Sequence, residues 1–309
     1  MKRDIMLPPG AGGRLDRAVA DALGVGRAAV KQAFAAGKVR VGGRRARGRD
    51  RAEAGSLVTI ELETAAGGVL PDGDMPLRVV AEEPGWLVAD KPAGVATHPL
   101  REGEVGTLAN AVVARYPECA EASPEPRDAG ALQRLDLETS GCVLFARSRD
   151  AWHALRAQFA SRTVEKLYLA LVAGRLASGG VCSVPLAQRG ARVVAVPDPE
   201  RPPRSTGRPR DAETRFEVLR AFAEHTLLEV RIVTGVMHQI RAHLAFLGHP
   251  VAGDLLYGGA AAVLPGTERH FLHASVLGFD APGGARVRVE CPLPPELQAI
   301  LDRLGARSS

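Results

Sequence analysis

An arginine and an aspartate stand two positions apart near the middle of the chain, at Arg134 and Asp136. Residues i and i+2 of an extended segment face the same side, so these side chains are expected to lie together. A neighbouring cation favours the ionised form of a carboxylate, which can then act as a base or a nucleophile. The same pair is also typical of a structural salt bridge at a strand end, and the two residues alone leave both interpretations open.

The residues that follow predict how this carboxylate is held. Thr139-Ser140-Gly141 has the composition of a tight turn, and the apolar run Cys142–Ala146 has that of a buried strand. Asp136 is therefore expected on a loop that leads into the sheet.

Two further side chains are candidates for the same site. Residues 166–172 read as a strand in which Lys166 and Tyr168 face one side. Residues 238–247 read as a helix with Ile240, Leu244 and Leu247 on its buried face. Arg241 lies near the start of that helix, where it could reach an acid from another segment.

A metal site is not indicated. The histidines His238, His243 and His249 do not converge on one helix face, and no pattern of carboxylates accompanies them. The four cysteines are widely spaced without a Cys-x-x-Cys pair, which favours reduced thiols in a cytoplasm over zinc binding or disulfides.

Length and composition set wider limits. The 309 residues suggest one large domain or two, and an apolar content of 46% with 24% charged residues is typical of a soluble globular protein. No apolar run approaches the roughly 20 residues of a membrane span. The first residues lack the apolar core of a secretory signal.

Positive charge is concentrated at the N-terminal end. Residues 1–62 hold 13 Lys/Arg against 6 Asp/Glu, whereas the remaining residues hold 27 against 29. The pattern there predicts helices over 15–23 and 27–36, then a hairpin around Gly42-Gly43 and a closing strand at 57–62. A basic helix face and a basic hairpin indicate contacts with nucleic-acid phosphates. The residues expected to make them are Arg27, Lys31, Lys38, Arg40, Arg44 and Arg45.

The chain is expected to divide into a small domain at 1–63, a linker at 64–76 rich in glycine and proline, and a large domain at 77–309. Lys91-Pro92-Ala93-Gly94 should be a loop in which Lys91 lies either near substrate phosphate or at the surface. The other expected strands are 77–81, 86–90, 214–219, 226–233 and 287–291, the other helices 107–116 and 151–160, and the loops 118–129 and 197–211.

Four ordered blocks of the large domain resemble the RluA-type RNA pseudouridine synthases. They are Lys91-Pro92-Ala93-Gly94, Arg134–Gly141 (Arg-Leu-Asp-x-x-Thr-Ser-Gly), Glu165–Val172, and Thr234-Gly235 with His238–Leu244 and Gly253-Asp254. The N-terminal segment resembles the RNA-binding domain first named in a small-subunit ribosomal protein. The resemblance implies an α/β (α+β) fold, with a mixed, mostly antiparallel central sheet flanked by helices around a central cleft.

The resemblance also implies residue roles. Asp136 would be the essential carboxylate, Tyr168 would stack on the uracil and take a proton, and Arg241 would pair with Asp136. Arg134 would extrude the base and fill its place. Lys166, His238 and Gln239 complete the expected substrate contacts. The reaction implied is an isomerisation that needs no cofactor.

The chain departs from the family pattern at three places. Gln133 stands where histidine is usual, Val236-Met237 where Arg-Thr is usual, and Asp90 where asparagine is frequent. These departures leave open a non-catalytic RNA-binding or ribosome-assembly protein as an alternative. A retaining glycoside hydrolase using Asp136 and Glu138 is a third possibility, which needs two carboxylates about 5 Å apart.

The expected partner is structured RNA, with large-subunit ribosomal RNA favoured and transfer RNA as the alternative. A monomer is expected.

Overall fold

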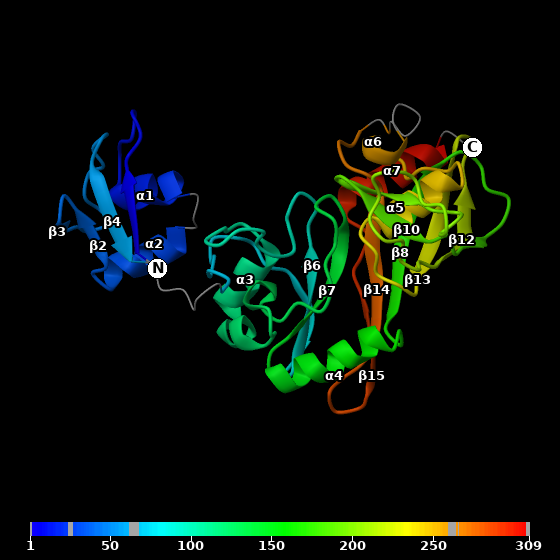
Figure 1. Cartoon of the computed structure of the whole chain (residues 1–309), viewed down its shortest axis with the longest axis horizontal. Coiled ribbons are helices and arrows are strands. Elements are labelled where there is room, and N and C mark those ends of the chain that lie inside the picture. Colours follow the sequence, from blue (N-terminus) through cyan, green and yellow to red (C-terminus); the bar gives the residue numbers. More distant parts are fainter. Residues whose placement is uncertain (1, 24–26, 62–67, 259–263, 265, 307–309) are drawn as a thin grey trace. The chain divides into compact units, whose positions relative to one another are not determined.

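The computed structural model describes residues 2–23, 27–61, 68–258, 264 and 266–306 (Figure 1). They form two compact units. The first comprises Met1–Leu87, Val95–Arg134 and Leu144–His153, and the second comprises Val88–Gly94, Leu135–Val143 and Ala154–Ser309. Among the described residues, no helix has the length and apolar character needed to cross a membrane.

The N-terminal segment folds as the sequence predicts, with one addition. Its elements are β1 (Lys2–Met6), α1 (Leu15–Leu23), α2 (Arg27–Ala35), β2 (Val39–Val41), β3 (Arg44–Arg45) and β4 (Leu57–Glu61). The strands pair antiparallel in the order β1-β4-β2-β3. Val19, Val30 and Val58 are among its fully buried side chains. Strand β1 was not predicted, because Lys-Arg-Asp-Ile-Met lacks the apolar content of a strand.

The predicted linker at 64–76 is described only from residue 68 onward. Residues 68–76 form neither helix nor strand, although Val69 and Leu70 are buried. The domain boundaries at 63 and 77 stay a prediction. In the rest of the first unit, helix α3 (Leu108–Arg115) begins at a capping box between Thr107 and Asn110. The region 118–129, expected as loop, contains two short 3-10 turns, η1 (Pro117–Glu121) and η2 (Pro126–Asp128), each started by proline.

A large sheet runs in the order β5-β6-β7-β14-β8-β13-β12-β9, with β15 paired to β14. Its strands are β5 (Val79–Glu83), β6 (Trp86–Lys91), β7 (Ser140–Ala146), β8 (Glu165–Ala173), β9 (Gly180–Cys182), β12 (Thr214–Ala221), β13 (His225–Ile232), β14 (Leu272–Asp280) and β15 (Arg286–Glu290). The pairings of β14 with β8 and β15 and of β13 with β8 and β12 are antiparallel, whereas β7 and β14 are parallel. The expected mostly antiparallel α+β fold is confirmed, and the central cleft stays a prediction.

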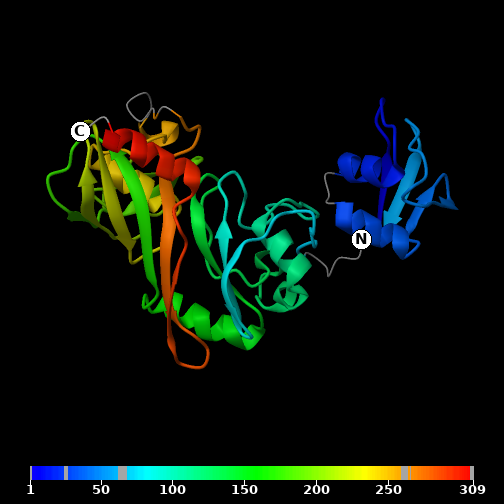
Figure 2. The same ribbon diagram turned by 180° about the vertical axis from the view of Figure 1, so that it is seen from behind.

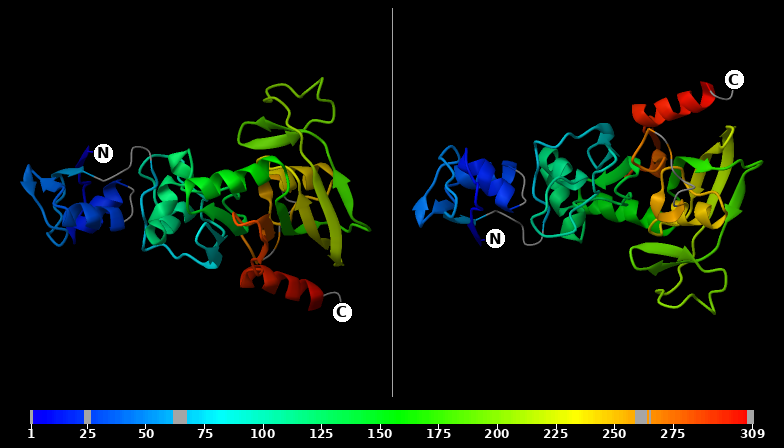
Figure 3. Two further views of the ribbon diagram at one scale, coloured as in Figure 1. Left: turned by 90° about the horizontal axis from the view of Figure 1, so that it is seen from below. Right: turned by 90° about the horizontal axis from the view of Figure 1, so that it is seen from above.

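Helices and a hairpin complete the second unit. Helix α7 (Pro295–Ala306) packs Leu297 and Ile300 into a core with Leu171 and Phe271, and it lies across the upper ends of the strands in Figure 2. The hairpin of β10 (Leu186–Arg189) and β11 (Arg192–Ala195) projects from the opposite side of the sheet in Figure 3. Residues 197–211 after the hairpin are irregular, as their prolines predict. The remaining helices are α4 (Arg149–Ala160), α5 (Gln239–Phe246) and α6 (Leu255–Gly258).

Helix α5 matches the predicted helix except at its end. Ile240 and Leu244 are buried as expected, but Leu247 is 39% exposed. The helix ends at Phe246, so Leu247 forms the C-cap and no longer follows the buried face. Gly248 then adopts φ 86°, which favours glycine at this position.

Gly141 fixes the contact between β7 and β14. It pairs with Ala274 and has φ 117°, and a Cβ atom at this position would stand 2.2 Å from the Ala274 carbonyl oxygen. That distance is far inside van der Waals contact, and the atom met is backbone. Only glycine therefore permits this register, which fixes the start of β7 at Ser140, four residues after Asp136.

We expect Gly141→Ala to lower the free energy of unfolding by about 2–3 kcal/mol more than Gly190→Ala does. Gly190 is the matched control, because it also has positive φ (62°), but a Cβ atom added there would meet no atom within 4 Å. Urea unfolding followed by circular dichroism measures both variants. Equal losses would show that β7 and β14 adjust without strain.

Candidate active site

The loop that carries Asp136 is anchored through its backbone. The Asp136 carbonyl accepts a hydrogen bond from the Thr139 N–H (3.1 Å), which closes a turn at Leu137-Glu138. The turn was predicted at Thr139-Ser140-Gly141, but Ser140 and Gly141 already belong to β7. The next carbonyl, that of Leu137, accepts from the Lys91 Nζ and the Gly94 N–H, each at 3.0 Å. The carboxylate itself is 22% exposed. The loop is thus held while its acid stays reachable.

Lys91 is fully buried, so the expectation of a surface position was wrong, whereas a place near substrate phosphate stays a prediction. It ends strand β6 and also donates to the Pro92 carbonyl at 2.9 Å. Burial, together with the nearby charge of Arg269, lowers the pKa of the Lys91 ammonium to about 7. Lys91 therefore supports the loop that carries Asp136 through its hydrogen bond to the Leu137 carbonyl.

The lowered pKa of Lys91 predicts a pH dependence of stability. Between about pH 7 and 10 the unfolded chain binds more protons at this lysine than the folded chain, so stability rises with pH. Lys91→Met should remove up to about 1.4 kcal/mol per pH unit of that rise. Urea unfolding at pH 7.0, 8.0 and 9.0 tests this, with the exposed Lys31→Met as the control. Parallel curves for wild type and Lys91→Met would contradict it.

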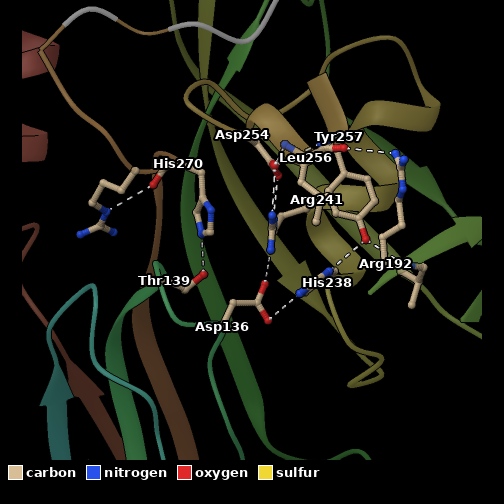
Figure 4. A network of polar contacts seen from close by, with 11 residues as sticks. Asp136, Thr139, Arg192, His238, Arg241, Asp254, Leu256, Tyr257 and His270 are labelled. Carbon is tan, nitrogen blue, oxygen red and sulfur yellow. Dashed lines mark hydrogen bonds and ion pairs between the residues drawn. The ribbon is translucent and has the colours of Figure 1, made fainter. Parts of the chain in front are cut away.

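Arg241 joins two carboxylates (Figure 4). Its Nη1 donates to Asp136 Oδ2 at 3.0 Å, while its Nε and Nη2 donate to the two oxygens of Asp254 at 2.6 and 3.0 Å. Burial opposes the charge, but the hydrogen bonds and charge of Asp254, followed by those of Asp136, raise the pKa of Arg241. The expectation that Arg241 reaches an acid from another segment is confirmed in the geometry.

Asp254 was not predicted as a site residue. Its side chain is only 1% exposed, and its Oδ1 also accepts the N–H groups of Leu256 and Tyr257 at 3.2 Å each. One carboxylate thus caps α6 and neutralises Arg241. The block Gly253-Asp254 was visible in the sequence, but its partner could not be inferred from spacing.

His238 and Tyr257 extend the same network. The His238 Nδ1 lies 3.0 Å from the Tyr257 hydroxyl, and its Nε2 lies 3.8 Å from Asp136 Oδ1. The Tyr257 ring also lies under the Arg241 guanidinium, 5.1 Å from its centroid. Nothing in the sequence pattern singled out Tyr257, because α6 is too short to show periodicity.

Gln239 has a different place from the one expected. It is 3% exposed, and its side chain accepts from Thr234 Oγ1 and the Val236 N–H and donates to the Glu213 carbonyl and Thr214 Oγ1. These contacts hold the start of α5, and the Gln239 side chain faces protein groups rather than a substrate.

Lys166 is half-buried and donates to the Thr234 carbonyl at 3.2 Å. Burial, with the charge of Arg162, lowers the pKa of Lys166 to about 8. Arg134, in contrast, is exposed at the end of a segment of the first unit.

Tyr168 occupies the middle of the sheet. It lies on β8 opposite Val230 of β13 and Ala274 of β14, and it is 9% exposed. Burial raises the pKa of the Tyr168 hydroxyl, and the nearby charge of Asp136 raises it further. The phenol is therefore neutral at physiological pH in the free protein.

Buried polar groups support the start of β7. Thr139 Oγ1 lies 2.8 Å from His270 Nε2, and Ser140 Oγ lies 2.9 Å from His273 Nδ1 and accepts from Arg269 Nη2 at 2.9 Å. Burial first of all lowers the pKa of both His270 and His273 to about 4, so both rings are neutral. Sequence reasoning missed these histidines, which flank no recognisable motif.

The remaining expected residues also have definite places. His243 and His249 contact Thr214 and the carbonyls of Val184 and Ala173, away from His238. Of the expected RNA contacts, Lys31, Arg40, Arg44 and Arg45 are exposed and Lys38 is half-buried. Arg27 begins α2, and its side chain lies outside the described residues.

Comparison with known proteins identifies the family. Residues 85–246 match the model of a family described as RNA pseudouridylate synthase. The chain belongs to this family. It is an RNA pseudouridine synthase, an isomerase, which supports the main reading of the sequence over the non-catalytic alternative.

The synthase has relatives along almost its whole length. It is 36% identical to the ribosomal large subunit pseudouridine synthase D of Xanthomonas campestris, over 99% of this chain and 94% of the relative. It is also 36% identical to an uncharacterized RNA pseudouridine synthase of Chloroflexus aurantiacus, over 100% and 95%. The solved structure of human RNA pseudouridylate synthase domain containing 1 aligns with a TM-score of 0.59 and 25% identity, covering 77% of the synthase and 96% of that chain.

Proposed function

We propose that this synthase converts specific uridines of large-subunit ribosomal RNA to pseudouridine, with Asp136 as the essential carboxylate. The observation that carries the catalytic part is the placement of Asp136, which is partly exposed on an anchored loop and ion-paired through one oxygen with Arg241. The names of its relatives, which refer to the ribosomal large subunit, support the target.

The reaction breaks the bond between the ribose C1′ and the uracil N1 and forms a bond from C1′ to C5. The C5 hydrogen leaves as a proton and N1 gains one, so atoms and electrons balance without a redox partner. The uridine must first leave its stack, which costs a few kcal/mol. A carboxylate then acts at the sugar, and a base removes the C5 proton.

Asp136 has the properties that the first step needs. Its Oδ2 is held by Arg241, while Oδ1 has only the longer contact of 3.8 Å to His238. A fixed carboxylate oxygen is therefore available at the sugar, whether it attacks C1′ or removes a ribose proton. Arg241 orients the carboxylate, and Asp254 keeps Arg241 in place.

Tyr168 would form the wall on which the uracil stacks. Its ring lies on the central strand β8 and the charge of Asp136 acts on its hydroxyl. Removing the C5 proton would require the phenolate, and burial makes that form costly in the free synthase. We therefore assign stacking to Tyr168 first and proton removal only after the site is filled.

Arg134 is exposed and is proposed to take the place of the extruded base. Lys166 is proposed to lie beside the substrate, where its lowered pKa reflects partial burial. Gln239 is proposed as a support of α5 rather than as a substrate contact, because four protein groups occupy its side chain.

The exposed arginines of the N-terminal hairpin would bind RNA phosphates. Arg40, Arg44 and Arg45 lie on the paired strands β2 and β3. The Arg45 guanidinium packs over Gly37, whose missing Cβ makes room for it. Such contacts supply affinity rather than sequence choice.

Asp136→Asn should abolish pseudouridine formation, because the amide can act neither as a base nor as a nucleophile at the sugar. RNA affinity should stay within about twofold of wild type, since one carboxylate makes no phosphate contact. Ribosomal and transfer RNA transcripts are incubated with each protein and pseudouridine is mapped chemically. Asp302→Asn, an exposed aspartate on α7, is the control. Modification by Asp136→Asn at the wild-type rate would overturn the assignment, and modification confined to transfer RNA would overturn the target.

Replacing Arg40, Arg44 and Arg45 together by alanine should weaken RNA binding and flatten its salt dependence. Loss of three phosphate contacts predicts that the slope of log K against log salt falls by roughly 2–3. Filter binding between 50 and 300 mM KCl measures it. The control replaces Arg286 and Arg288 of β15 by alanine. An equal loss of RNA affinity in both variants would mean that only net charge matters.

A further inference from the structure

We propose that Tyr257 is a positioning residue that fixes the ring tautomer of His238, so that its Nε2–H faces Asp136. This inference rests on the proposed role of Asp136 and adds a second group that orients this carboxylate. The residues come from three elements, β11, α6 and the start of α5. Figure 4 shows Tyr257 beside His238, and His238 beside Asp136.

Hydrogen-bond accounting at the Tyr257 hydroxyl leads to the tautomer. The backbone N–H of Val193 donates to this oxygen at 2.9 Å. The hydroxyl proton is then directed to its other neighbour, His238 Nδ1, at 3.0 Å. A nitrogen that accepts this proton carries none of its own, so in the neutral ring the proton resides on Nε2. That nitrogen is the one nearest Asp136 Oδ1, at 3.8 Å.

The backbone at His238 is itself unusual. The residue has φ 53° and ψ 20°, a left-handed conformation that is uncommon for residues other than glycine. A strained backbone conformation persists only where surrounding contacts hold it, and such conformations are frequent at functional sites. Here the side chain of Gln239 and the bond from the Ala242 N–H to the His238 carbonyl (2.9 Å) hold it. The conformation presents the imidazole to both Tyr257 and Asp136.

Tyr257 is well placed to be rigid. Its ring meets the His238 ring edge to face, with centroids 5.7 Å apart, and packs with Val236 and Met237 on an apolar cluster. The side chain of Arg192 on β11 donates to the Leu256 carbonyl, which ties α6 to the hairpin. Val236 and Met237, which depart from the family pattern, pack against the same apolar cluster as this tyrosine.

The tautomer of His238 determines what faces the second oxygen of Asp136, Oδ1. Arg241 holds Oδ2, and a movement of about 1 Å would bring His238 Nε2–H into hydrogen-bond range of Oδ1. Both oxygens would then be oriented, Oδ2 by Arg241 and Oδ1 by His238. A ring with the other tautomer would present a lone pair to the carboxylate and repel it.

Tyr257→Phe tests the inference, since it removes the hydroxyl and keeps the ring. Histidine ¹⁵N spectra of the wild type should show His238 as the Nε2–H tautomer, with the signal identified by its absence in His238→Asn. In Tyr257→Phe the signal should shift to a mixture of tautomers. The single-turnover rate at saturating RNA should fall roughly tenfold, the scale of one hydrogen bond, while RNA affinity stays within about twofold. Tyr116→Phe, a buried tyrosine of the first unit, is the matched control.

The outcomes separate this inference from the proposed function. A wild-type His238 that is protonated on Nδ1, or an unchanged spectrum in Tyr257→Phe, would overturn it even if Asp136→Asn is inactive. A changed tautomer with an unchanged rate would overturn the positioning role. Because the spectra need no RNA, the tautomer is measurable even if the synthase proves inactive on ribosomal RNA.

Discussion

The ion pair between Arg241 and its two carboxylates is the interaction on which the site depends. Two charges removed from water are stable only with good geometry and with further hydrogen bonds. Asp254 satisfies this condition, because it meets Arg241 through both oxygens and also caps α6. Arg241 keeps one N–H for Asp136, the more exposed of the two acids. Asp254 thus holds Arg241 in place, and the Asp136 carboxylate stays accessible.

Buried polar groups fix the segments around this pair. Lys91 and Gly94 hold the Leu137 carbonyl, Gln239 holds the turn before α5, and Ser140 and His273 connect β7 with β14. Each of these groups replaces water with a protein partner, so the backbone at the site is set before RNA arrives. Preorganisation of this kind is what positions a reacting group to within a fraction of an ångström.

The sequence was most informative where local pattern decides structure. The strand over Cys142–Ala146, the alternating strand that carries Tyr168 and the helix with Arg241 near its start were all predicted from periodicity and composition. Residues defined by long-range contacts were not. Asp254 precedes the four-residue helix α6 and Tyr257 lies within it, and the burial of Lys91 depends on segments distant in the chain. Resemblance to a family supplied the roles that periodicity could not.

The pairing of β7 with β14 also determines when the site can exist. Asp136 meets Arg241 across 105 residues, and Ser140 meets His273 across 133. Contacts of such long range form late, because loop closure must precede them. During synthesis the chain emerges from its N-terminus, so Asp136 is made long before the strand that secures its loop. A nascent chain therefore carries its N-terminal basic segment well before the strand that secures the Asp136 loop, so the site is completed only late in synthesis.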